Sequence, residues 1–210
     1  MKKLFFGLLA FSATLVCFVS CSKCSHDSEK SVEDSTVTKL INTDKEYMEG
    51  VAKDYSYFES CFTFAETVDT LDEPTIVYVS NIFQTVNKET NQPTVYISEH
   101  FLDKGDSTKW DVKEGSFWLE DLNLREFKVE LTVEEAFVKL QEANIVKPKT
   151  KYCVLRAQLG PKRVNAQYIF GNEATGMVYV DAVTGDVTDK NPVFEGFTEE
   201  TPQDTTVVSE

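Results

Sequence analysis

The sequence predicts an α+β fold in which a helix packs on an antiparallel sheet. Apolar residues recur at helical spacing in two segments, residues 47–62 and 133–143. Each of these segments is followed by several short segments that are rich in β-branched and aromatic residues and are separated by polar or Gly-containing turns. One sheet covered by two helices, or two similar subdomains side by side, would bury the apolar faces.

Residues 1–20 have the layout of a secretory signal peptide. Lys2 and Lys3 precede a stretch of apolar residues, which ends at Ser20 and is followed at once by Cys21. The apolar stretch is short for a spanning helix, which needs about 20 apolar residues. The end of the segment resembles lipoprotein signals, in which a small residue precedes the cysteine that takes the lipid. We therefore expect cleavage before Cys21 and attachment to a membrane of the cell envelope through Cys21.

The two ends of the mature chain have compositions that do not favour a packed core. Residues 21–43 are polar and charged, which predicts a flexible tether, and residues 198–210 predict a disordered tail. Ser22 in place of an Asp after the lipidated cysteine favours the outer membrane, on the periplasmic or the outer side. The formal net charge of −14 excludes a general affinity for nucleic acid.

The first folded half is predicted to cover residues 44–130. Its helix is expected to begin at Thr43 or Asp44, because both are favourable N-cap residues. Extended segments are then expected at the following positions: residues 75–86, residues 94–97, a pair at 110–112 and 116–119, and residues 127–131.

The second folded half is predicted to cover residues 131–197. Thr132 and Glu135 form a capping box at the start of a helix. Three strands are expected to follow, at residues 151–159, 166–170 and 177–181. The segment from Asp181 to Val187 is expected to serve a tight turn.

The second half resembles a PepSY-like domain, of the group found in secreted bacterial lipoproteins. The resemblance is carried by the helix start Thr132-Val133-Glu134-Glu135-Ala136 and by the closing Tyr179-Val180-Asp181-Ala182-Val183-Thr184-Gly185-Asp186-Val187. It implies a small antiparallel sheet wrapped on a helix, as in cystatin-like or β-lactamase-inhibitor-like proteins, with the first half as a diverged second copy. PepSY domains in protease propeptides are linked to inhibition or chaperoning of the attached enzyme. This chain departs from that setting, because no protease domain follows. From the resemblance, together with the lack of a catalytic set of residues, we expect a binding or inhibitory module for another envelope protein.

Catalytic chemistry is not expected. The chain has two histidines, and it lacks a G-x-S-x-G elbow, a Walker A loop and a G-x-G-x-x-G loop. We expect no enzyme, cofactor or metal site.

Two further sets of residues are candidates for a role. Cys61 and Cys153 are candidates for a disulfide in an oxidising compartment, although burial as free thiols is the alternative. Trp110, Phe117 and Trp118 are candidates for a stacking platform, with packing in the core as the alternative. The platform would make the protein a glycan- or small-ligand-binding surface lipoprotein, which is the second function that the sequence suggests.

Overall fold

The structure, a computed structural model, describes residues 35–196 except 106, 119 and 120. Its elements follow the chain in this order: α1 (Thr36–Val51), β1 (Ser56–Phe64), β2 (Ile76–Val86), β3 (Pro93–Phe101), the 3-10 turn η1 (Leu102–Lys104), β4 (Ser107–Glu114), β5 (Asp121–Leu122), η2 (Leu124–Glu126), α2 (Val133–Glu142), β6 (Tyr152–Gln158), β7 (Gln167–Asn172), β8 (Gly176–Asp181) and β9 (Val187–Thr188). The predicted α+β class is confirmed.

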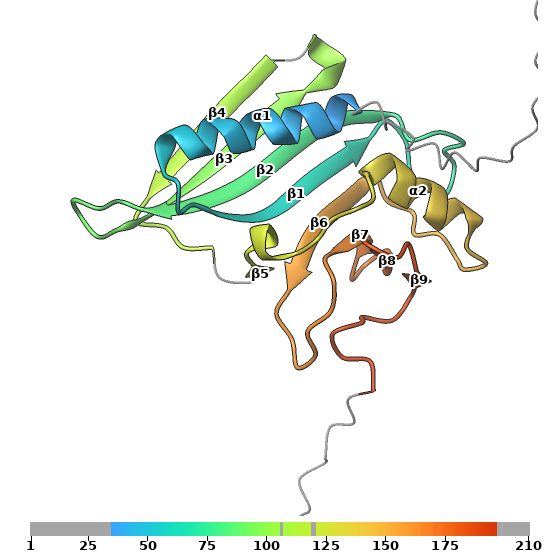
Figure 1. Cartoon of the computed structure of the whole chain (residues 1–210). Coiled ribbons are helices and arrows are strands. Elements are labelled where there is room, and N and C mark those ends of the chain that lie inside the picture. The colour runs from blue at the N-terminus through green and yellow to red at the C-terminus, as the bar shows by residue number, and fades with distance from the viewer. Residues whose placement is uncertain (1–34, 106, 119–120, 197–210) are drawn as a thin grey trace, which may run out of the picture. The chain divides into compact units, whose positions relative to one another are not determined.

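Eight strands form one antiparallel sheet in the order β4-β3-β2-β1-β6-β7-β8-β9, and β5 pairs with β6 outside this order (Figure 1). Each half of the chain contributes a helix and then four strands that pair with their neighbours in sequence. The two halves meet where β1 pairs with β6, with Cys61 opposite Val154. Of the two arrangements that the sequence allowed, the structure has the single sheet with two helices.

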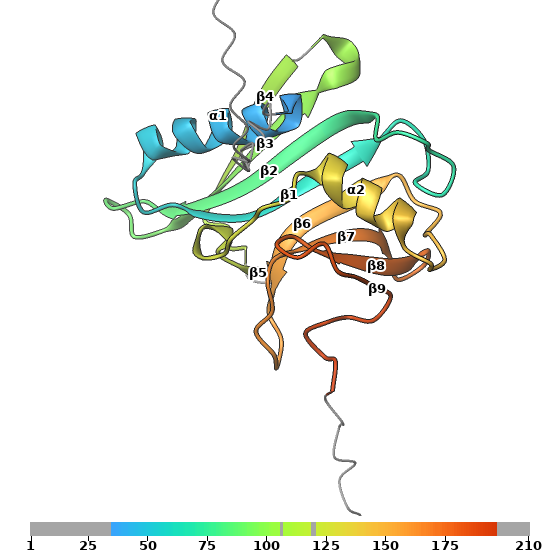
Figure 2. The same cartoon turned by 45° about the vertical axis from the view of Figure 1, so that its right-hand side comes forward.

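Both α-helices lie on the same face of this sheet (Figures 1 and 2). On β1, Phe64 packs against Phe137 of α2, with ring centroids 5.5 Å apart. Ser60 lies on the same face, because side chains alternate along a strand, and it is linked through Asn81 to Asp44 of α1. The core therefore lies between the helices and this face of the sheet.

Helix α1 begins earlier and ends earlier than predicted. Ser35 is its N-cap, and its side chain accepts a hydrogen bond from the N–H of Thr38. The polar composition of residues 36–43 predicted a tether, but Val37 and Met48 bury an apolar face on the sheet. The tether prediction is wrong for residues 36–43, and Asp44 is a buried residue within the helix and not its cap.

The aromatic residues beyond Val51 were assigned wrongly to the helix. Phe58 and Phe62 belong to β1, and Tyr55 lies just before that strand. A bulge between Tyr57 and Glu59 breaks the alternation of inward and outward side chains along that strand. The apolar residues of the strand therefore recur at a spacing that also fits a helix.

The remaining elements of the first half agree with the sequence only in part. Strands β2 and β3 were predicted. The predicted pair at 110–112 and 116–119 is wrong, because β4 pairs with β3 and residues 116–118 form no strand. Residues 127–131 form no strand either; the N–H groups of Glu130 and Leu131 both donate to the carbonyl of Ala182.

The second half agrees with the sequence, except that the short strand β9 was not predicted. Thr132 caps α2, and both hydrogen bonds of the capping box with Glu135 are present. Strands β6, β7 and β8 lie at the predicted positions. No helix among the described residues is long and apolar enough to cross a membrane. The predicted signal peptide and tail lie outside the described residues.

Candidate functional site

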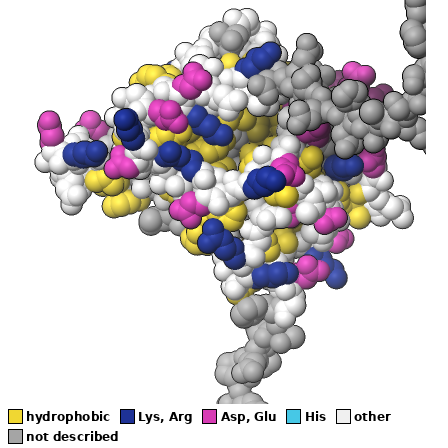
Figure 3. Space-filling model, viewed as in Figure 1, with side chains coloured by type: hydrophobic (Ala, Val, Ile, Leu, Met, Phe, Trp, Pro, Cys, Tyr) yellow, Lys and Arg dark blue, Asp and Glu magenta, His cyan; other side chains and the backbone are white. Residues whose placement is uncertain are grey.

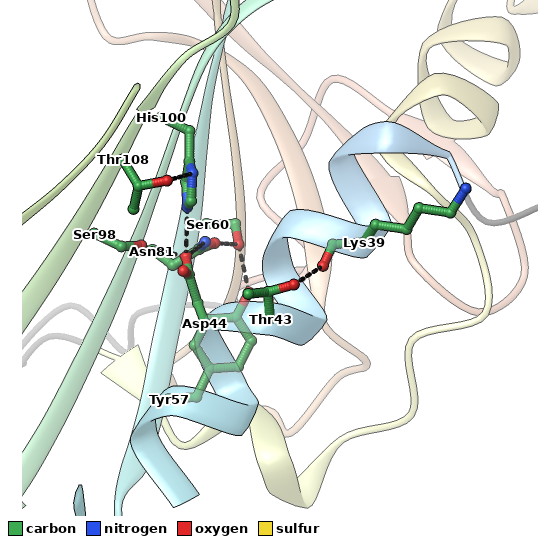
Figure 4. Close-up of polar contacts among 9 residues, drawn as sticks. All are labelled: Lys39, Thr43, Asp44, Tyr57, Ser60, Asn81, Ser98, His100 and Thr108. Atoms are coloured by element: carbon green, nitrogen blue, oxygen red, sulfur yellow. Dashed lines mark hydrogen bonds and ion pairs between the residues drawn. The ribbon is translucent and has the colours of Figure 1, made fainter. Parts of the chain in front are cut away.

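A network of buried polar side chains joins α1 to the middle of the sheet (Figure 4). At its centre, the Oδ2 atom of Asp44 accepts hydrogen bonds from the side chains of Asn81 (2.6 Å) and Ser98 and from the Nε2 atom of His100 (2.8 Å). Asp44, Asn81, Ser98 and His100 are each at most 2 % exposed. A carboxylate removed from water at this depth is costly unless donors surround it, so the three donors fix the position of Asp44 on the sheet.

The network continues from Asn81 along β1. The hydroxyl of Ser60 donates to the Oδ1 atom of Asn81, which leaves the hydroxyl of Tyr57 to donate to Ser60. Burial is the main cause that raises the pKa of Tyr57 far above 10.0, so this phenol stays protonated and keeps its role as donor. The hydrogen bonds thus run in one direction, from Tyr57 to Asp44.

On its other side, the network reaches the surface at β4. The Nδ1 atom of His100 lies 3.1 Å from the Oγ1 atom of Thr108, which is exposed. The network therefore connects α1 to β3 through His100 and to β4 through Thr108.

The consequence of this attachment is an aromatic pair between α1 and β4. Tyr47 follows Asp44 by three residues, and Trp110 follows Thr108 by two, so each lies next to a member of the network. Their ring centroids are 4.4 Å apart. The Trp110 ring also lies 6.2 Å from Phe83, on the core side. Trp110 is half-buried, whereas Tyr47 is 49 % exposed.

Exposed apolar residues extend this pair into a surface. Val51 lies one helical turn after Tyr47 and is 41 % exposed. Val112 lies on the same face of β4 as Trp110, is 46 % exposed and pairs with Tyr96 of β3. We call Tyr47, Val51, Tyr96, Trp110 and Val112 the α1–β4 patch. Figure 3 shows hydrophobic side chains at the surface of the face that carries both helices, among charged side chains of both signs.

The three aromatic residues of the candidate platform have different surroundings. Trp110 packs with Tyr47 and Phe83 in the layer between α1 and the sheet, which is the alternative that the sequence left open for it. Phe117 is 63 % exposed and Trp118 is half-buried, in the segment after β4. The sequence missed Tyr47 as the partner of Trp110, because it placed the two residues in elements that it could not bring together.

Cys61 and Cys153 are both free thiols, which is the alternative to a disulfide that the sequence left open. Cys61 pairs with Val154 and Cys153 pairs with Phe62, so the two cysteines lie on adjacent strands one register position apart. Side chains at successive positions point to opposite faces of a sheet, which turns the two thiols away from each other. Burial raises the pKa of the Cys153 thiol well above 9.0.

The turn after β8 is built by Asp181, as predicted. Its Oδ1 atom accepts hydrogen bonds from the N–H groups of Val183 (2.8 Å) and Thr184 (2.9 Å), and Gly185 supplies a φ of 76°. Burial raises the pKa of Asp181, but these two N–H groups and the side chains of Asn165 and Gln167 together lower it below 3.8. The carboxylate form of Asp181 therefore serves the turn.

Comparisons with protein-family models, with curated proteins and with solved structures found no match for this chain. Cys21, the predicted lipid acceptor, lies outside the described residues. Among the described residues, no group of three or more His, Cys, Asp or Glu side chains is placed to hold a metal ion.

Proposed function

We propose that this chain is a PepSY-like lipoprotein of the cell envelope that acts as a non-enzymatic binding or inhibitory module for another envelope protein. The T-x-E-E-A and D-A-x-T-G-x-V motifs support the PepSY-like assignment, and they lie at the start of α2 and at the end of β8. The repeated order of one helix and four strands supports two tandem copies, of which the first has diverged. Cys21 would hold the module at the membrane.

The observation that carries the proposal is the α1–β4 patch. Exposed apolar patches on soluble domains mark interaction sites, and Trp and Tyr are the residue types that contribute most to protein interfaces. The aromatic pair is half-exposed although it is attached to the core through Phe83, so it is rigid before a partner arrives. A rigid surface loses little conformational entropy on binding.

The position of the patch indicates the kind of partner. Strand β4 is the end strand of the sheet in the described residues, so the backbone groups on its outer side face no other strand. Its charged side chains are of both signs: Lys109, Asp111, Lys113 and Glu114. We expect an extended segment of the partner protein to lie along β4 and to place apolar side chains on Tyr47 and Val112.

Photo-crosslinking in intact envelopes tests this surface. A photoreactive amino acid is placed at Val112 or, as the matched control, at Val138 of α2, because each valine is 46 % exposed. We expect a discrete adduct with a different protein from position 112 and not from 138, and we expect it to disappear in Tyr47→Asp. Equal adducts from both positions, an adduct that survives Tyr47→Asp, or an adduct between two copies of this chain would contradict the proposal.

A further inference from the structure

Two cationic side chains lie together on the other flank of α1, away from the α1–β4 patch. Lys45 projects from α1, and Arg125 comes from η2. The side chain of Asn123 connects η2 to β1, because it accepts hydrogen bonds from the N–H groups of Tyr57 (3.0 Å) and Arg125 (3.2 Å). Other cations of this acidic protein form ion pairs, such as Lys109 with Glu99 and Arg163 with Glu126. Neither Lys45 nor Arg125 has a carboxylate partner among the described residues.

Arg125 is fixed by its surroundings. Its Nη1 atom donates to the carbonyl oxygens of Tyr55 (2.7 Å) and Lys53 (3.2 Å). Its guanidinium carbon lies 4.1 Å from the centre of the Tyr55 ring. A guanidinium has five N–H donors, so donors remain for a further acceptor. Their directions are fixed, because the plane of the guanidinium is held over the Tyr55 ring.

Lys45 is held beside this guanidinium. Its Nζ atom lies 4.9 Å from the centre of the Tyr57 ring, and the side chain is half-buried. The pKa of Lys45 is lowered from 10.5, first by burial and then by the positive charge of Arg125. The half-buried ammonium of Lys45 and the exposed guanidinium of Arg125 repel each other, and an anion bound at both would remove that repulsion.

We propose that Lys45 and Arg125 form a binding site for an oxyanion, either a carboxylate or a phosphate group of a small ligand. Arg125 would provide the planar donor pair that these groups accept, and Lys45 would provide a second charge at a different angle. The rings of Tyr55 and Tyr57 hold both cations in place, so the site exists before the ligand binds. The inference does not depend on the proposed protein partner, because it concerns a different flank of α1.

Residue-resolved labelling of lysines tests the site on the full chain in detergent. Each amine is acetylated briefly, and the rate at Lys45 is followed by mass spectrometry with added phosphate, with added acetate, or with chloride at the same ionic strength. Lys104 is the matched control, because its Nζ atom also lies over a ring, 5.0 Å from the centre of Phe101, but outside the proposed site. An oxyanion at about ten times its Kd should slow labelling of Lys45 about tenfold and leave Lys104 unchanged.

The two added anions distinguish the ligand sources: protection by phosphate alone assigns a phosphate ligand, and protection by acetate alone or by both assigns a carboxylate-tolerant site.

Calorimetry with the protecting anion then compares wild type with Lys45→Gln and Lys104→Gln. Lys45→Gln should lose the binding heat and Lys104→Gln should keep it, and both should fold because Gln is a good helix former and each side chain is partly exposed. Equal slowing of both lysines, protection by chloride, or binding that survives Lys45→Gln would overturn the proposal. None of these outcomes depends on whether the crosslinked partner is found.

Discussion

The carboxylate of Asp44 and the imidazole of His100 lie 2.8 Å apart, Oδ2 to Nε2, where both side chains are almost wholly buried. They join the first helix to the third strand, and Thr108 extends the connection to the fourth. The first half of the domain therefore has a polar attachment at its centre, while α2 is attached by apolar contacts such as Phe137 on Phe64.

Replacement of Asp44 should destabilise the domain strongly. Asp44→Ala leaves the donors of Asn81, Ser98 and His100 buried without their acceptor, and we expect a loss of about 3 kcal/mol in the free energy of unfolding. Urea denaturation followed by circular dichroism measures it. Glu46→Ala, at an exposed position of the same helix, should change the free energy by less than about 0.5 kcal/mol. Equal effects of the two substitutions would show that the network does not hold α1.

The turn at Asp181 should make stability depend on acid pH. The folded pKa of Asp181 is lowered, so its contribution is complete above the unfolded value near 4 and is lost as the pH falls through the folded pKa. Asp181→Asn should therefore be less stable than wild type at pH 7, and the difference should shrink at pH 3. Urea denaturation at both pH values checks this. Asp189→Asn, at an exposed position, is the control, and a constant deficit of Asp181→Asn across the pH range would refute the assignment.

The two cysteines of the folded region should react differently. Cys61 is half-buried and Cys153 is fully buried with a raised pKa, so a maleimide should label Cys61 in the native protein and Cys153 only after unfolding. Peptide mapping by mass spectrometry distinguishes the two sites. A peptide pair linked through Cys61 and Cys153 in protein kept from reductants would show that the disulfide forms after all.

The predicted anchor is tested by Cys21→Ser. Without the thiol that takes the lipid, the protein should move from the membrane fraction to the soluble fraction, with unchanged circular dichroism. Cys24→Ser keeps the predicted acceptor and should stay with the membrane. Retention of Cys21→Ser in the membrane fraction would remove the lipoprotein part of the proposal.

The sequence predicted the second half of the fold better than the first for a physical reason. In the second half, local chemistry marks each boundary: the Thr132 capping box starts α2, and the Asp181 turn ends β8. In the first half, α1 buries few apolar residues and carries a buried Asp44, which looks like a cap or a solvent-exposed residue. The donors that make Asp44 acceptable lie on β2 and β3, so no local pattern identifies it.

Among the residues of the α1–β4 patch, the sequence analysis identified only Trp110 as a candidate for binding. For Trp110, the sequence left open either packing in the core or a place in a stacking platform. The half-buried ring packs on the core and also contributes to the surface. Its neighbour Tyr47 comes from a helix 63 positions earlier in the sequence. Only the pairing of β4 with β3, and the attachment of α1 through His100, brings these two rings together.

The pairing of β1 with β6 has a consequence for how the chain acquires its structure. The first four strands can pair with one another as soon as they are synthesised. One edge of β1 stays unpaired until β6, from the other half of the chain, has been synthesised. Until then, β1 is an unpaired edge next to the apolar core, which is the kind of surface that aggregates. The high sequence separation of this contact slows its formation. A fragment that stops before β6 should therefore be insoluble, even though it contains a helix and a complete run of four strands.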